Sequence, residues 1–130
     1  MSIQRVNEWI IYGKEALSVL EIAKNGEIEK AFRGQISSFG AAVSMGNLKS
    51  AVAFFSQQAN SAVARDQLLC AICYVLQRAE GKERNDIHTN EIKTDKIFDY
   101  VCEHDCVMLK NKFLDASVAI KLAMNLFKLV

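Results

Sequence analysis

The chain contains no proline among its 130 residues. Proline marks loops and sheet edges and breaks helices, so its absence favours long helices joined by short turns. No run of alternating Val, Ile or Thr indicates a strand. A chain of this length forms one domain with room for a core. We therefore expect an all-α fold, a compact bundle of about five to six helices, in a single helical domain that spans residues 1–130.

Apolar residues recur at helical spacing, and small polar residues mark the helix ends. The first helix is expected at residues 2–24, before a stop at Asn25-Gly26. Asn47 can cap a helix that runs to residue 58, and Asn60 or Ser61 can cap the next one, which ends near residue 80. A polar loop then follows at residues 80–91.

Three further helices complete the expected bundle. The segment at residues 35–46 comes directly before the Asn47 cap. Thr89 or Thr94 can cap a shorter helix that ends at residue 104. The last helix is expected at residues 107–130.

The segment at residues 35–46 has an unusual stripe of small side chains at helical spacing: Ser37, Gly40, Ala41 and Ser44. The large side chains lie on the neighbouring face: Ile36, Phe39 and Val43. Small residues let another helix approach closely, and a glycine inside a helix costs about 1 kcal/mol relative to alanine. We therefore expect both faces of this helix to be buried.

The following helix should face the core with four residues at helical spacing: Leu48, Ala51, Val52 and Phe55. Phe54 lies off that face. Two interpretations remain for Phe54: another helix of the same domain covers it, or it contacts another subunit.

Composition limits the classes of function. The chain is 51% hydrophobic and 24% charged with a formal net charge of +1, so it is globular, and any affinity for nucleic acid must come from a local patch. Arg5 and Glu8 interrupt the only early apolar run, so no secretory signal is expected, and no uncharged stretch is long enough to span a bilayer. These features predict a cytoplasmic protein without membrane contact.

The four cysteines form two pairs, Cys70 with Cys73 and Cys102 with Cys106. On helices, each spacing puts the pair on one face, and two such faces can make a zinc site. The alternative is that Cys70 and Cys73, in an uncharged run, are packed free thiols. We favour packing and expect no metal and no cofactor.

No motif for catalysis is present in the sequence. It contains no phosphate-binding glycine loop, no metalloprotease motif and no nucleophile elbow. Asp86 and His88, two residues apart in the polar loop, could form a hydrolytic pair, but this spacing is little evidence for one, and a solvated loop is the favoured interpretation. We expect a protein that is not an enzyme.

Basic residues are the candidates for nucleic-acid contact, because phosphates are bound by Lys and Arg that share a surface. The first three candidates lie at or near expected helix ends, where backbone N–H groups could assist, and the next three cluster around the loop entrance. Lys121 and Lys128 are seven residues apart and are expected on one face of the last helix. With 16 basic and 15 acidic residues, an ordinary solvated surface remains the alternative. The candidates are Arg33, Lys49, Arg65, Arg78, Lys82, Arg84, Lys121 and Lys128.

The stretch FRGQISSFGAAVSMGNLKSAVAFF resembles the signature region of a known family, the small helical subunit of the type III-B CRISPR (Cmr) RNA-guided effector complex. The ending AIKLAMNLFKLV is similar to that family's final helix. The middle of the chain, from about residue 77 to 110, carries no matching motif. The matching positions are Arg33-Gly34, Ser38-Phe39-Gly40, Leu48-Lys49, Ala51 and Phe54.

The resemblance implies a non-catalytic subunit that stacks along the complex and helps to hold the path of guide and target RNA in antiviral defence. The implied partners are the large polymerase-like subunit, the backbone subunits, further copies of the chain, and the RNA. A second hypothesis is a helical protein-binding adaptor that docks through Phe54 and the C-terminal helix without touching RNA. A third is a small cysteine-ligated metalloprotein.

Overall fold

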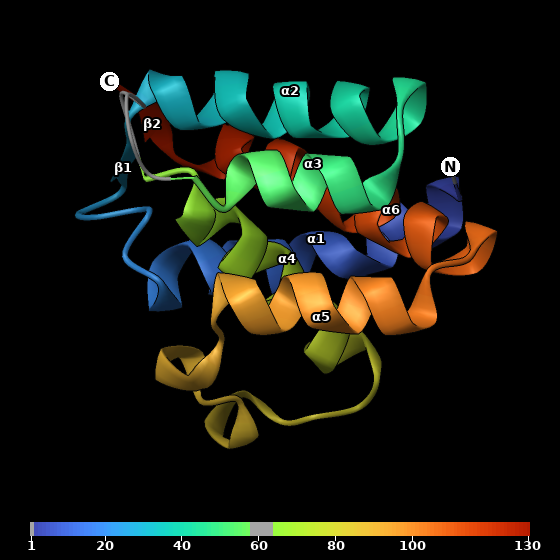
Figure 1. Ribbon diagram of the computed structural model, residues 1–130. Coiled ribbons are helices and arrows are strands. Elements are labelled where there is room, and N and C mark those ends of the chain that lie inside the picture. The colour runs from blue at the N-terminus through green and yellow to red at the C-terminus, as the bar shows by residue number, and fades with distance from the viewer. Residues whose placement is uncertain (1, 58–63) are drawn as a thin grey trace.

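The computed structural model describes residues 2–57 and 64–130 (Figure 1). Six α-helices form this part of the chain, which confirms the all-α prediction. Three short 3-10 helices lie in the connections: η1 Arg84–Asp86, η2 Thr89–Glu91 and η3 Met124–Leu126. The α-helices are α1 Ile3–Val19, α2 Lys30–Met45, α3 Leu48–Phe55, α4 Asp66–Ala79, α5 Thr94–His104 and α6 Val107–Ala123.

Helix α6 is the central element of the core. It contacts α1, α2 and α4, and its residues Phe113, Ala116 and Ile120 are almost completely buried. Asp115, Ser117 and Ala119 are also buried, so α6 has buried side chains on more than one face. A helix that is buried on several faces belongs inside a bundle. Helices α2 and α3 form one side of the molecule and α5 another (Figure 1).

Helices α1 and α6 approach one another closely at Gly13. A Cβ atom at this position would lie 3.2 Å from the Ile120 Cα and 3.3 Å from the Ala119 carbonyl oxygen. Glycine is the residue that permits this distance, because a larger side chain would meet backbone atoms. The sequence pattern indicated close packing at Gly40 and gave no such signal at Gly13.

The expected stripe of small residues is only partly buried. Gly40 does face α6, where a Cβ would lie 3.6 Å from the Ser117 Oγ, an ordinary contact distance. Ala41 and Ser44, however, are exposed. The prediction that both faces of this helix are buried is therefore wrong, since burial follows the large side chains: Phe32, Ile36, Phe39 and Val43.

The turn from α2 into α3 agrees with the prediction from sequence. The Asn47 side chain accepts a hydrogen bond of 2.8 Å from the Ser50 backbone N–H and caps α3. All four residues that were expected to face the core are buried: Leu48, Ala51, Val52 and Phe55. The Phe55 ring meets the Phe39 ring edge to face, with 5.3 Å between centroids.

Several helix ends differ from the predictions. Helix α1 ends at Val19 and not at residue 24, because Glu21 adopts a positive φ angle of 59°, which a right-handed α-helix does not contain. Helix α2 begins at Lys30, five residues earlier than expected, and includes Gly34. Helix α5 begins at Thr94 with Lys93 as its N-cap, so the prediction that Thr89 or Thr94 caps this helix is wrong. Asn60 and Ser61 lie outside the described residues, and α4 begins at Asp66.

The C-terminal end is not helical as far as residue 130. Helix α6 ends at Ala123, and a short parallel pair joins β1 Glu27–Ile28 to β2 Lys128–Leu129. The Ile28 carbonyl accepts from the Val130 N–H at 2.9 Å, and the Val130 carbonyl accepts from the Lys30 N–H at 3.0 Å. These bonds connect the start of α2 to the far end of the chain, a pairing that no local pattern indicates. Among the described residues, no helix is both long enough and apolar enough to cross a membrane.

Candidate nucleic-acid interface

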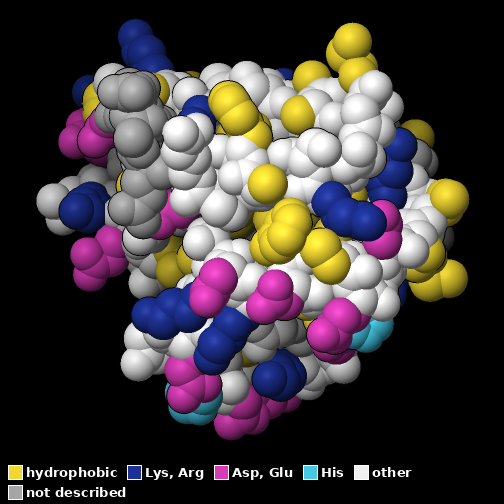
Figure 2. All heavy atoms as spheres, viewed as in Figure 1, with side chains coloured by type: hydrophobic (Ala, Val, Ile, Leu, Met, Phe, Trp, Pro, Cys, Tyr) yellow, Lys and Arg dark blue, Asp and Glu magenta, His cyan; other side chains and the backbone are white. Residues whose placement is uncertain are grey.

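The layer made by α2 and α3 belongs to a stretch of sequence without acidic residues. No Asp or Glu lies between Glu29 and Asp66, a stretch that we call the acid-free segment (residues 30–65). Figure 2 shows mainly uncharged surface over α2 and α3, with hydrophobic side chains among it, whereas Lys, Arg, Asp and Glu mix over α5 and the loop below. The segment has four charged residues, and all are basic: Lys30, Arg33, Lys49 and Arg65.

Phe54 is exposed on this layer, with 56% of its surface accessible. No helix in the described part of the chain covers it, so the interpretation that it is buried within the domain is wrong. The Arg65 guanidinium stacks on its ring at 4.4 Å from the centroid. Arg65 is itself held by a hydrogen bond of 3.2 Å from its Nε to the Gln57 carbonyl. The result is an exposed aromatic face beside a positioned cation.

Arg33 and Lys49 differ in their surroundings. Arg33 is half-buried in the second turn of α2, and it has no hydrogen bond or ion pair within residues 2–57 and 64–130. Lys49 forms an ion pair with Asp105, with 3.7 Å between Nζ and Oδ2, and both side chains are exposed. An exposed pair of this kind contributes about 1 kcal/mol or less, so it does not prevent Lys49 from meeting another anion.

These cations are spread along the layer and do not form one cluster. Arg33 is near the start of α2, while Lys49 is at the start of α3, directly after α2 ends. Twelve residues of helix separate Arg33 from Met45, which corresponds to about 18 Å along the axis at 1.5 Å per residue. The arrangement therefore fits an extended ligand better than a single anion.

Arg78 serves mainly to join helices. Its Nε donates to the Glu15 Oε1 at 3.0 Å, and the guanidinium lies over the Tyr12 ring at 4.7 Å. Tyr74 also donates to Glu15 at 3.0 Å. The hydrogen bond with the Glu15 carboxylate raises the pKa of Arg78, and burial, followed by the bond to Glu15, raises the pKa of Tyr74. The group fastens α4 to α1.

The remaining candidates from the sequence lie elsewhere. Lys82 donates from Nζ to the Gln77 Oε1 at 3.4 Å, and its carbonyl accepts from Arg78. The structure therefore brings the candidates Arg78 and Lys82 together at the end of α4. Arg84 is exposed in η1. Lys121 is in the last turn of α6, but Lys128 is in β2, so the prediction that they share one helix face is wrong.

The cysteines have separate environments. Cys70 donates from Sγ to the Ile92 carbonyl at 3.6 Å, and the Cys106 sulfur accepts from the Leu109 N–H at 3.4 Å, which caps α6. Cys102 is exposed on α5. Within the described ranges, no three His, Cys, Asp or Glu side chains are grouped as a metal site would require.

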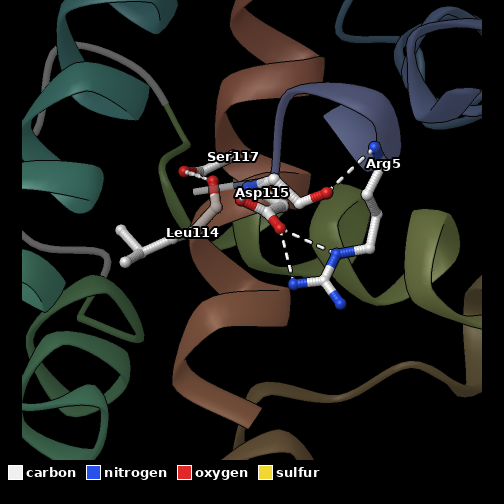
Figure 3. Close-up of polar contacts among 5 residues, drawn as sticks. Arg5, Leu114, Asp115 and Ser117 are labelled. Carbon is white, nitrogen blue, oxygen red and sulfur yellow. Dashed lines mark hydrogen bonds and ion pairs between the residues drawn. The ribbon is translucent and has the colours of Figure 1, made fainter. Parts of the chain in front are cut away.

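Sequence reasoning missed a buried ion pair between Asp115 and Arg5 (Figure 3). The Asp115 side chain is fully buried on α6, and its Oδ2 lies 2.7 Å from the Arg5 Nε and 2.6 Å from Nη2. The Ser2 N–H donates to the other carboxylate oxygen at 3.3 Å. The partners are 110 residues apart in sequence, and no local signal indicates the pairing. Lys30 was also missed, although it is the first residue of the acid-free segment.

The geometry thus offers a mainly uncharged layer with widely spaced basic side chains and an exposed aromatic ring, which can meet phosphates and one unstacked base or an apolar partner side chain. Comparison of the chain with protein-family models, with curated proteins and with solved structures gave no match.

Proposed function

We propose that this chain is a non-catalytic small subunit of a type III-B CRISPR RNA-guided effector complex, in which the layer of α2 and α3 lies along the guide–target RNA. The observation that carries the proposal is the charge asymmetry. The acid-free segment has a charge of +4 and the rest of the chain has −3, although the formal net charge is only +1. Such an asymmetry orients a subunit with its basic layer toward a phosphate backbone.

The spacing of the basic residues supports an RNA path in preference to a compact anion. Phosphate contacts position a protein without reading sequence, and they require cations along the backbone. Arg33, near the start of α2, and Lys49, at the start of α3, are far enough apart to contact different phosphates of one RNA strand. Phe54, with Arg65 stacked on it, adds a surface that can pack against a base or a neighbouring subunit.

The residues of the signature region that carries the resemblance also belong to this layer. Phe39 and Ala51 are buried and fix the packing of α2 and α3 on the core. Arg33, Lys49 and Phe54 have solvent access on the same two helices. In this proposal the first group maintains the layer, and the second group meets the RNA, the large polymerase-like subunit, the backbone subunits or a further copy of the chain.

A second candidate is a protein-binding adaptor without RNA contact. It is favoured by the exposed apolar side chains on the layer, because Met45 is 89% and Phe54 56% accessible. Exposed apolar side chains on a mainly uncharged surface are typical of protein contacts. This candidate needs no phosphate near Arg33.

Purification of the tagged chain from its native cells tests both candidates, with an untagged culture as the control. Our proposal expects RNA of uniform guide length to copurify with the polymerase-like and backbone subunits. Partner proteins without RNA, after nuclease-free isolation, favour the adaptor. A chain that elutes alone, without protein or RNA, contradicts both. The purified chain alone is expected to show no RNA cleavage, and cleavage that is lost on Asp86→Ala with His88→Ala would contradict a non-catalytic role.

A further inference from the structure

A second site lies away from the acid-free segment, in a cavity of about 410 Å³. Residues from α1, α4, α5 and α6 and from the η2 connection line it, and none comes from α2 or α3. Its apolar wall includes Trp9, Leu76, Ile92 and Phe113. The volume is in the range of about 300–1,000 Å³ that is usual for small-molecule sites, which are mostly apolar with a few polar groups at fixed positions.

Charged side chains lie around this apolar wall. Three lysines line the cavity, Lys93, Lys96 and Lys112, together with the carboxylates of Glu80 and Glu91. Arg5 also lines it, and the charge of Arg5 is balanced by the buried Asp115. The lining with Asp115 included therefore has one positive charge in excess, which matches a ligand with a single negative charge.

The Arg5 guanidinium is held in position for such a ligand. Its Nε and Nη2 are bound to the fully buried Asp115, and its Cζ lies 5.3 Å from the centre of the Trp9 ring. Within the described residues, its Nη1 has no hydrogen-bond acceptor, and Figure 3 shows that atom pointing away from Asp115. Arginine has five N–H donors, so donors remain beside the cavity. A fixed donor loses little conformational entropy on binding.

We propose that this cavity binds a monoanionic amphiphile, a molecule with one carboxylate or other singly charged head and an apolar body. The head accepts a charge-assisted hydrogen bond from Arg5 and is attracted by the three lysines. The apolar body packs against Trp9, Leu76 and Phe113. This site is separate from the proposed RNA surface, and the two can be tested independently.

The only tryptophan of the chain, Trp9, is in the cavity wall and reports directly on binding. The probe is 8-anilinonaphthalene-1-sulfonate, a fluorescent monoanionic amphiphile, excited by energy transfer from Trp9. Decanoate and decyltrimethylammonium, each below its micelle concentration, and decanol below its solubility limit then compete for the site. We expect decanoate to displace the probe at a concentration at least about tenfold lower than decanol or the cation requires. Equal displacement by decanol, or no binding of the probe, overturns the proposal.

Charge reversal provides the second test. The variant with Lys96→Glu and Lys112→Glu changes two lysines of the lining that have solvent access, so the fold should be retained. We expect decanoate to bind about tenfold more weakly to this variant. Lys14→Glu, an exposed change on α1 outside the cavity lining, is the matched control and should leave affinity unchanged. Equal affinity of the double variant and the control contradicts the proposal.

Discussion

Asp115 carries a carboxylate that is removed from water and held by Arg5 and the Ser2 backbone. Burying a charge is costly, and the attraction of its partner recovers that cost only with good geometry. The two contacts from one guanidinium to Oδ2, at 2.7 and 2.6 Å, supply such geometry. The pair therefore fixes the start of α1 against α6, and the loss of one partner should be worse than the loss of both.

Arg5→Ala should lower the free energy of unfolding by about 3–5 kcal/mol, because Asp115 stays buried without its ionic partner. The double variant Arg5→Met with Asp115→Leu should recover most of this loss, since no charge remains in the core. Urea unfolding followed by circular dichroism measures each variant. A double variant as unstable as the sum of the two single variants would show that the residues do not interact.

The buried thiols of α4 make the stability of the fold depend on pH in the alkaline range. Burial raises the pKa of Cys73 from 9.0 to about 12, and burial together with the charge of Asp66 raises that of Cys70 to about 11. Because the folded state retains these protons longer than the unfolded state does, stability is complete below pH 9 and falls as the pH rises through 9–12. Between pH 8.5 and 10.5 we expect a loss of about 2–3 kcal/mol, most of it from Cys73, because the partial exposure of Cys70 weakens its contribution.

Thermal unfolding at a series of alkaline pH values measures this effect. Cys73→Val removes one titrating group, so the slope of stability against pH should become shallower above pH 9. Cys102→Ser, a change at an exposed thiol, is the control and should leave the slope unchanged. If Cys73→Val and the parent have the same slope, the thiol of Cys73 does not titrate in this way.

At the scale of elements, the crossing of α1 and α6 depends on Gly13. A methyl group there would meet the Ile120 Cα and the Ala119 carbonyl, and backbone atoms cannot turn aside as a side chain can. Gly13→Ala should therefore destabilise the fold by about 1–3 kcal/mol. Gly34→Ala is the control, because a Cβ at Gly34 meets no atom within 4 Å. Gly34→Ala should stabilise α2 by about 0.5–1 kcal/mol. Calorimetry of the two variants compares them, and a Gly13→Ala protein as stable as the parent would contradict the close crossing.

Local signals in the sequence located most of the elements. The Asn47 cap and the inward set from Leu48 to Phe55 were correct, because capping and periodicity depend on neighbours in sequence. The errors lie where distant segments meet. Ile28 pairs with Leu129, and this strand pair replaces the end that was expected for α6. The stripe of small residues pointed to Gly40, whereas the closest helix crossing lies at Gly13, for which the sequence gave no signal.

The candidate site was predicted less completely than the fold. The run without acidic residues was visible in the sequence, and it contains Arg33, Lys49 and Phe54. The sequence did not show which of these side chains form hydrogen bonds or ion pairs with other helices. Arg78 is hydrogen-bonded to Glu15, whereas Arg33 is partly exposed and has no such partner among the described residues. Side-chain partners from other helices decide which cations can meet a ligand, and those partners are not set by local pattern.

At the scale of the whole molecule, the charge distribution has two consequences. The acid-free segment attracts a phosphate backbone, while the net charge of −3 on the rest of the chain repels it. A single copy should therefore bind RNA weakly, with little preference for sequence and a steep dependence on salt. Several copies side by side would join their short basic layers and bind by avidity.

The most direct test of an RNA-facing layer is the affinity of the assembled effector complex for target RNA across a salt series. The complexes compared contain the parent subunit, the variant with Arg33→Glu and Lys49→Glu, or Asp105→Asn, which frees Lys49 from its ion pair. We expect the charge-reversed subunit to be incorporated, to weaken binding, and to reduce the magnitude of the salt slope by about one for each phosphate that a subunit no longer binds. Asp105→Asn should strengthen binding. Unchanged affinity and slope with the charge-reversed subunit incorporated would contradict the RNA-facing layer and favour the adaptor.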